Sequence, residues 1–218
     1  MLCFTHPMEA VHPLVLLGTH VRLEPLAPAH LAPLAAIAAR HRDSYRLTSV
    51  PDSASGMGGY LELAFSQARA NTALPFATVE RAHGTVVGST RFWALEFWSW
   101  PVGHPLRRPE GVPDAVEIGY SWLAPEAQRT AINTEAKLLM LTHTFECWEV
   151  HRVTLRTDAR NARSRAAIER LGARLDGVLR AASAGNDGAI RDTASYSLLR
   201  GEWPEVRERL TERLASRR

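Results

Sequence analysis

The segment YSWLAPEAQRTAINTEAKLLML, residues 120–141, changes character twice along its length. It starts as an aromatic and apolar run, breaks at Pro125, continues as a polar and partly basic stretch over residues 128–134, and ends strongly apolar. This order predicts a strand over residues 115–123, a turn, and a helix over residues 133–148. Because the helix is apolar almost all round, we expect it to pack on a sheet with little exposure. The polar stretch, called the elbow below, therefore lies at the start of a buried helix.

The elbow has the properties of an anion site. The first turn of a helix carries backbone N–H groups without a helical partner and a partial positive charge. Arg129 and Lys137 are mildly unfavourable near an empty helix start, and a bound phosphate would turn this penalty into an attraction. Alternatively, Asn133 or Thr134 caps the helix and the basic side chains point to solvent. The segment alone leaves both interpretations open.

The rest of the chain alternates between strand and helix patterns. Apolar–polar alternation between turn residues predicts further strands at residues 21–26, 76–80, 85–93, 150–157, 175–179 and 193–199. Helical patterns predict further helices at residues 29–40, 57–70, 161–171 and 203–218, with Gly172 as a left-handed C-cap. Helices come first, a strand meander follows, and strands then alternate with helices. The order predicts an α/β or α+β domain with a single sheet.

Length and composition set broad limits on function. A chain of 218 residues suits one domain with a sizeable core. Its 26 basic and 23 acidic side chains give a net charge of +3, too weak to indicate a nucleic-acid partner. No stretch approaches the roughly 20 apolar residues of a membrane helix, and the first residues make a poor signal peptide. We therefore expect a cytoplasmic protein with no membrane partner.

The cysteines and histidines show no metal-binding pattern. Cys3 and Cys147 are too few for a disulfide framework or a zinc site. Cys147 follows an apolar run and is predicted to be a small core residue. His104, His143 and His151 lack the spacing of metal ligands. No metal site is predicted.

Two motifs resemble those of one enzyme family. The elbow pattern Gln128-x-x-Ala131-x-Asn133, between a strand with a proline turn and a buried helix, resembles the coenzyme A loop of the GCN5-related N-acetyltransferases (GNAT). The segments NARS at 161–164 and LGA at 171–173 resemble the Asn-x-x-Ser and Leu-Gly signature that follows in that family. With VRLEPL near the start and VEIGYSWL before the elbow, the chain is similar to the RimJ/RimL-like branch of ribosomal-protein N-terminal acetyltransferases.

The resemblance implies an acyl-CoA N-acyltransferase fold, with one mixed, mostly antiparallel central sheet flanked by helices. It implies a GNAT domain over residues 18–203, after an extension at 1–17 and before a C-terminal helix at 204–218, and a possible homodimer. It also implies acetyl-CoA as co-substrate. The implied cofactor-binding residues are Tyr120, Trp122, Leu123, Gln128, Arg129, Thr130, Ala131, Ile132, Asn133, Thr134, Asn161 and Ser164. Ala131 stands where the family usually has glycine, and its Cβ is tolerable only if φ is negative.

Acetyl transfer from a thioester to an amine needs a neutral amine, a stabilised oxyanion and a proton for the departing thiolate. The resemblance implies direct transfer in a ternary complex. Glu117, on the strand before the elbow, is the candidate general base, and its alternative is a paired strand glutamate. Ser164 is the candidate acid, and its alternative is a first-turn helix serine. Tyr196 is a second candidate proton donor, although such a tyrosine is often a core residue. Asn161 either contacts the cofactor or only caps its helix.

The pKa of the acceptor amine bears on the substrate. An α-amine costs about 1 kcal/mol to deprotonate at pH 7, whereas a lysine side chain costs roughly 4.6 kcal/mol. A site with one candidate base therefore favours a protein N-terminus or a small-molecule amine over lysine. Two other classes compete. An acyl-CoA-binding sensor that lost turnover is favoured by Ala131, and an RNA-associated protein is disfavoured by the weak net charge.

Residues 94–114 form a long connection rich in tryptophan, proline and glycine. Trp98 and Trp100, with Arg107 and Arg108, indicate a segment that covers the acceptor site or contacts another subunit. The alternative is that the segment packs over the core of its own domain.

Overall fold

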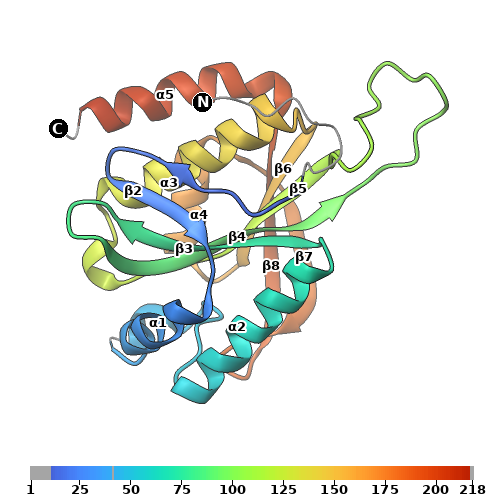
Figure 1. Ribbon diagram of the computed structural model, residues 1–218. Helices are drawn as coiled ribbons and strands as arrows, with labels where there is room; N and C mark the ends of the chain where they lie inside the picture. The colour runs from blue at the N-terminus through green and yellow to red at the C-terminus, as the bar shows by residue number, and fades with distance from the viewer. Residues whose placement is uncertain (1–10, 41, 217–218) are drawn as a thin grey trace.

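The computed structural model describes residues 11–40 and 42–216 (Figure 1). It contains one eight-stranded sheet with the order β1-β2-β3-β4-β5-β6-β8-β7. The strands are β1 Leu16–Leu17, β2 Val21–Pro25, β3 Ala73–Glu80, β4 Thr85–Glu96, β5 Ala115–Leu123, β6 Arg152–Asp158, β7 Arg174–Ala184 and β8 Ile190–Leu199. The α-helices are α1 Leu31–Ala38, α2 Ala54–Arg69, α3 Ala131–Thr142, α4 Ala162–Leu171 and α5 Trp203–Ala215. The predicted fold class is confirmed.

The sheet is mostly antiparallel and covered on both faces. Only β5 and β6 pair in parallel, and the other neighbouring strands are antiparallel. Figure 1 shows α3 and α5 on one side of the sheet and α1 and α2 on the other. The buried apolar side chains form one core cluster that includes residues of these helices and of the central strands. No helix in the described part of the chain is long and apolar enough to cross a membrane.

The parallel pair β5–β6 is short. The pairing joins Ala115 to Arg152 and ends where Glu117 meets Thr154. Both strands continue past this point, β5 to Leu123 and β6 to Asp158. The sheet therefore opens after Glu117, with β5 on one side of the gap and β6 on the other.

A bulge interrupts the β4–β5 ladder beside this gap. Ser89 pairs with Trp122 and Arg91 with Gly119, so one residue of β4 opposes two residues of β5. Tyr120, one of those two, has a φ of 51°. The extra residue in β5 bends the strand and leaves backbone groups outside the ladder.

The start of α3 differs from the prediction. The helix begins at Ala131, and the side chain of its N-cap Thr130 accepts a hydrogen bond from the Ile132 N–H at 3.2 Å. Asn133 and Thr134 therefore lie inside the first turn, and the prediction that one of them caps the helix is wrong. After Thr142 the helix widens into a π-helix at His143–Cys147.

The other helix ends agree better with the sequence. Gly172 ends α4 with a φ of 98°, as predicted. Asn161 caps α4, because its Oδ1 accepts a hydrogen bond from the Ser164 N–H at 3.0 Å. Strands β7 and β8 are longer than predicted.

Cys147 is half-buried and disulfide-bonded, so the prediction of a small core residue is wrong. The prediction for Cys3 lies outside the described residues.

The 94–114 connection leaves the sheet at the end of β5 away from the elbow and projects from the body of the protein (Figure 1). Asp114 holds its base, accepting hydrogen bonds from the Trp98 N–H and the Trp100 Nε1, both at 2.7 Å. Further from the sheet the connection is exposed to solvent, and Val102 is 97% exposed. Leu95 and Val112, near the two ends of the connection, pack against the core cluster, and the described residues of the connection do not line the cavity at the elbow. A lid is therefore not supported, and a subunit contact stays a prediction.

Candidate active site

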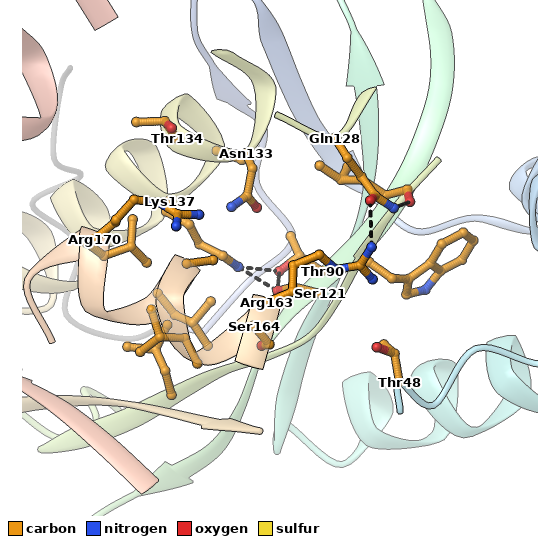
Figure 2. Close-up of a pocket in the computed structure, with 18 of the residues that line it drawn as sticks. Thr48, Thr90, Ser121, Gln128, Asn133, Thr134, Lys137, Arg163, Ser164 and Arg170 are labelled. Atoms are coloured by element: carbon orange, nitrogen blue, oxygen red, sulfur yellow. Dashed lines mark hydrogen bonds between the residues drawn. The ribbon is translucent and has the colours of Figure 1, made fainter. Parts of the chain in front are cut away.

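A cavity of about 400 Å³ lies where the sheet opens, between α3 and α4 (Figure 2). It extends from the elbow across the strands to Tyr45 and Thr48 in the segment between α1 and α2. The predicted cofactor-binding residues that line it are Tyr120, Trp122, Leu123, Gln128, Arg129, Thr130, Asn133, Thr134, Asn161 and Ser164. Ala131 and Ile132 instead line a neighbouring cavity of about 330 Å³ beside Thr19 and His20.

The ionisable groups of the cavity lining are all basic. The lining contains six basic side chains, Arg129, Lys137, Arg156, Arg163, Arg170 and Arg213. Among the described residues that line it there is no aspartate, glutamate or histidine. The whole chain has a net charge of only +3, so the sequence concentrates positive charge here. A cavity lined by one sign of charge attracts ligands of the opposite sign.

The elbow is held in place by its own side chains. The Gln128 Nε2 donates to the Leu123 carbonyl at 3.0 Å, and the Gln128 Oε1 accepts from Arg163 at 3.0 Å. Arg129 has a φ of 64°, so the sharp turn falls there. Ala131 is helical and does not have a positive φ. Its Cβ therefore causes no backbone strain, which meets the condition set by the sequence.

Lys137 lies inside the protein, contrary to both interpretations of its position from the sequence. Its side chain is 5% exposed, and its Nζ donates to the Ser121 Oγ at 2.5 Å and to the Thr90 Oγ1 at 3.1 Å (Figure 2). Burial lowers the pKa of Lys137 to about 7, because a desolvated ammonium is unfavourable. The amine lines the cavity from below α3 rather than facing solvent beside the elbow.

Glu117 lies at the point where β5 and β6 separate. It is 5% exposed, and its Oε2 is 3.4 Å from an Arg156 guanidinium nitrogen. That oxygen accepts no hydrogen bond from the described residues. Burial raises the pKa of the Glu117 carboxyl, and the nearby Arg156 opposes the rise. Glu117 does not itself line the cavity, but its neighbours Ile118 and Arg156 do.

The two remaining predicted catalytic residues occupy different surroundings. Ser164 is half-buried in the first turn of α4 and lines the cavity. Tyr196 is fully buried and does not line it. The Tyr196 hydroxyl accepts from Arg165 at 2.8 Å and donates to Glu169 at 3.0 Å, which joins β8 to α4. The structure therefore places Ser164, but not Tyr196, at the cavity.

The sequence did not predict most of the cavity cations. Arg163 and Arg170 are seven residues apart on α4, a spacing that puts both on one helix face. Arg156 comes from β6 and Arg213 from α5, so only the tertiary fold brings them to the site. In the sequence, the seven-residue spacing of Arg163 and Arg170 was the one feature that could have indicated a cationic site.

A mixed sheet that opens beside a parallel strand pair, with a helix start and a cationic cavity at the opening, defines the class of acyl-CoA N-acyltransferases. The chain matches the family described as "Acetyltransferase (GNAT) domain" over residues 20–174. This match covers more than half of the chain. The protein therefore belongs to the GNAT family of acetyltransferases, and the family prediction is confirmed.

Named relatives support the predicted branch. Over 98 residues the chain is 39% identical to the Bacillus subtilis protein "Putative ribosomal N-acetyltransferase YdaF", a match over 45% of this chain and 52% of that relative. The chain thus spans about half the length of the curated relative it matches. A GCN5-related N-acetyltransferase from Brucella melitensis superposes with a TM-score of 0.78 at 25% identity, over 93% of this chain and 86% of that chain.

Mycobacterium smegmatis RimJ, solved with CoA-disulfide, superposes with a TM-score of 0.70 at 24% identity, over 94% of each chain. This likeness shows a shared fold.

Proposed function

We propose that the protein is an acetyl-CoA-dependent N-acetyltransferase that transfers an acetyl group to a primary amine. The observation that carries this proposal is the cavity of about 400 Å³ with six basic side chains and no carboxylate in its lining, at the start of α3. Coenzyme A carries a diphosphate, and helix starts and arginines are the groups that proteins use to bind phosphates. Family membership supports the same activity.

The residues present fit this co-substrate. The first turn of α3 begins at the elbow, where Arg129, Asn133 and Thr134 line the cavity. Arg163 and Arg170 approach from α4. We propose that these groups bind the phosphates, and that the gap between β5 and β6 takes the extended arm. When bound, the co-substrate supplies the activated acetyl group as a thioester.

The acceptor amine needs a base. We assign this role to Glu117, because its carboxyl is buried beside the gap and burial raises its pKa, which makes it a stronger base. Its Oε2 has an open acceptor position at the end of the gap. The Ser164 hydroxyl at the cavity is the proposed proton donor to the departing sulfur. Cys147 is disulfide-bonded and lies outside the cavity lining, which supports direct transfer in a ternary complex.

We propose two kinds of acceptor amine, a protein N-terminus and a small-molecule amine. The relative named as a ribosomal N-acetyltransferase supports a protein N-terminal α-amine. A small-molecule amine remains the other member of the class, because both have a lower pKa than lysine. We further propose a cytoplasmic protein, as expected from the sequence, and a homodimer, on the resemblance to the family alone.

Thiol release from acetyl-CoA tests the function. Peptides with a free N-terminus, the same peptides with a blocked N-terminus, and small amines serve as acceptors. We expect release only with free α-amines or small amines. Tight binding of acetyl-CoA without release for any amine would instead support a catalytically silent acyl-CoA-binding sensor. Failure to bind acetyl-CoA at all would refute both.

A further inference from the structure

Lys137 is the single lysine of the chain, and it reaches the cavity from an unusual direction. Its amine lies between α3 and the sheet and contacts Thr90 on β4 and Ser121 on β5. Ser121 belongs to the bulged part of β5, which the β4 ladder leaves unpaired. The lysine therefore occupies the place where the sheet beside the gap has an irregular backbone.

Both contacts of Lys137 are hydroxyls. The Thr90 Oγ1 and the Ser121 Oγ are also 2.6 Å from each other, and either can be the donor. A hydroxyl can accept a hydrogen bond from an ammonium or donate one to a neutral amine. This pair therefore accommodates Lys137 in both protonation states. A carboxylate partner would instead have fixed the charged form.

The charged groups that line the cavity together with Lys137 are arginines, a residue type whose guanidinium is not deprotonated in proteins. The elbow contributes Arg129, β6 contributes Arg156, and α4 and α5 contribute Arg163, Arg170 and Arg213.

Nearby acids and histidines point elsewhere. Glu135, two residues before Lys137 on α3, accepts the backbone N–H groups of residues 19–21 at 2.6–2.8 Å. His143 at the end of α3 is neutral, because burial lowers its pKa to about 4. Burial disfavours the charged form of Lys137, and the described lining contains no aspartate or glutamate that would offset it.

We propose that Lys137 takes up a proton from solvent when a polyanionic acyl-CoA fills the cavity, so that binding of the co-substrate is coupled to protonation of this buried amine. This inference rests on the proposed function and adds a residue to its binding site. The phosphates supply the negative charge that the cavity lining lacks. The protonated amine then donates to Thr90 and Ser121, and it stabilises the bulged strand beside the bound arm.

The direction of the pH dependence follows from the free protein. The pKa of Lys137 is about 7 before binding, and a nearby anion raises it, typically by about 1 to 3 units. Below pH 7 the amine is already charged and binding needs no proton. Above pH 7 each binding event must take up a proton, so affinity falls as the pH rises. Between pH 7 and pH 9 the dissociation constant should increase about 5- to 50-fold for shifts of this size.

Titration calorimetry of the full chain tests the coupling without a mutation. The ligand is the acetyl thioester of dephospho-CoA, which lacks a free thiol and a terminal phosphate, so the ligand itself does not titrate in this range. Binding heats at pH 8 in two buffers of different ionisation enthalpy give the number of protons taken up. We expect about 0.4 to 0.9 protons per ligand. An uptake below about 0.1 with tight binding would overturn this inference and leave the proposed function intact.

The Lys137→Met variant shows whether Lys137 is the group that takes up the proton. It keeps Glu117, the other group beside the cavity with a shifted pKa, so uptake that remains in the variant belongs to that carboxyl. We expect the variant to lose the uptake and to bind with a dissociation constant independent of pH between 7 and 9. Unchanged uptake in the variant would overturn the assignment to Lys137. Absence of binding by the wild type would instead refute the proposed function.

Discussion

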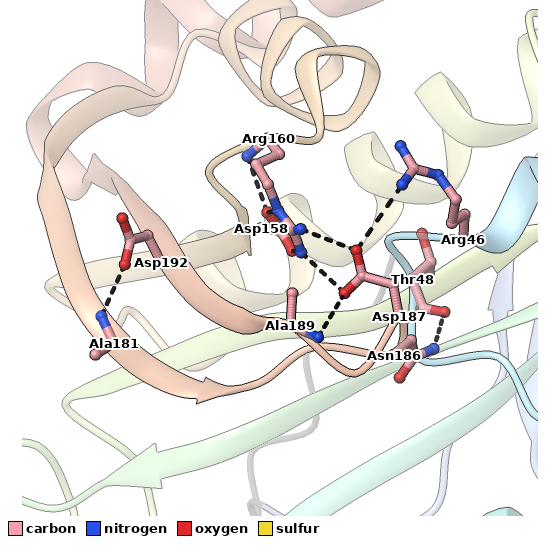
Figure 3. A network of polar contacts seen from close by, with 9 residues as sticks. All are labelled: Arg46, Thr48, Asp158, Arg160, Ala181, Asn186, Asp187, Ala189 and Asp192. Carbon is pink, nitrogen blue, oxygen red and sulfur yellow. Dashed lines mark hydrogen bonds and ion pairs between the residues drawn. The ribbon is translucent and has the colours of Figure 1, made fainter.

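Two groups of arginines in this protein have opposite surroundings. In the loop network of Figure 3, Arg160 contacts Asp158 and Asp187, each with a closest distance of 2.8 Å, and Arg46 lies 3.9 Å from Asp187. Asn186 also donates a hydrogen bond to the Thr48 carbonyl. The turn between β7 and β8 is thereby fastened to the segment between α1 and α2. In the cavity, five arginines and Lys137 line one space without a carboxylate in the lining, and Figure 2 shows three of these six side chains, Lys137, Arg163 and Arg170.

The difference separates a structural role from a binding role. An arginine between two aspartates is already neutralised by carboxylates of the protein. It can hold two loops together, but it has few donors and little net charge available to bind a ligand. Cations gathered around one cavity repel one another and weaken the empty protein, and the Glu117 carboxylate beside Arg156 lies outside the cavity lining. Their arrangement is explained if an anionic ligand completes it. The predictions below test this contrast in order of decreasing effect.

The largest effect is expected at Glu117, the carboxylate beside the cavity that binds no phosphate. Glu117→Gln should lower kcat about 10²- to 10⁴-fold, because the amide cannot accept the amine proton. Acetyl-CoA affinity should stay within about twofold, since Glu117 is outside the cavity lining. Steady-state kinetics and calorimetry check the two values. A weaker affinity with an unchanged kcat would contradict the assigned role.

The next effect concerns the stability of the empty protein. Lys137→Met should increase the free energy of unfolding at pH 7 by roughly 1 to 4 kcal/mol, because it removes a buried cation. The pKa of Lys137 in the folded protein, about 7, lies below the 10.5 of a free lysine side chain. The penalty is therefore constant below pH 7 and declines as the pH rises from 7 towards 10.5. Urea denaturation at several pH values measures it. A destabilised variant would mean that the lysine supports the empty fold.

A matched pair of charge removals tests the contrast itself. Arg170→Gln in the cavity should weaken CoA binding about tenfold, which is the loss of one charge-assisted contact, and it should not lower Tm. Asp187→Asn in the loop network should lower Tm by a few degrees and leave CoA affinity unchanged. Calorimetry and thermal melts are run on both variants. The contrast fails if the two substitutions have the same pattern of effects.

The loop network also predicts a pH dependence. The hydrogen bonds from Arg160 lower the pKa of Asp158 and of Asp187 below the 3.8 of a free aspartate side chain. Their stabilisation is therefore complete above pH 3.8 and is lost as the pH falls below it. The Tm difference between the wild type and Asp187→Asn should shrink in the same range.

The smallest effect is expected at Ala131. Because its backbone is helical, glycine there relieves no strain, and Ala131→Gly should leave CoA affinity within about threefold while slightly destabilising the start of α3. A large loss of affinity, measured by calorimetry, would show that the Ala131 side chain itself supports the elbow.

Local patterns accounted for the elements and for the elbow. The break at Pro125 and the apolar run after it are sequence features that act within a few residues, so the strand, the turn and the buried helix were predictable. The start of α3 was missed by two residues because Thr130, not Asn133 or Thr134, supplies the cap. Such a choice depends on where the strand ends, which the periodicity does not fix.

The direction of Lys137 could not be predicted in the same way. A lysine near a helix start is ordinarily exposed, and only the bulge between β4 and β5 creates the hydroxyl pair that receives it. The convergence of Arg156, Arg163 and Arg213 likewise comes from three elements that meet only in the folded chain. The fold and the elbow could therefore be predicted from the sequence, whereas the positive charge of the site depends on which residues the tertiary structure brings together.

The most direct test of the account compares two ligands by calorimetry. CoA and pantetheine share the thiol arm, and only CoA carries phosphates. If the cationic cavity recognises phosphates, CoA should bind at least about 100-fold more tightly than pantetheine at low salt, and the difference should decrease as salt is added. Equal affinities for the two ligands, independent of salt, would contradict the account.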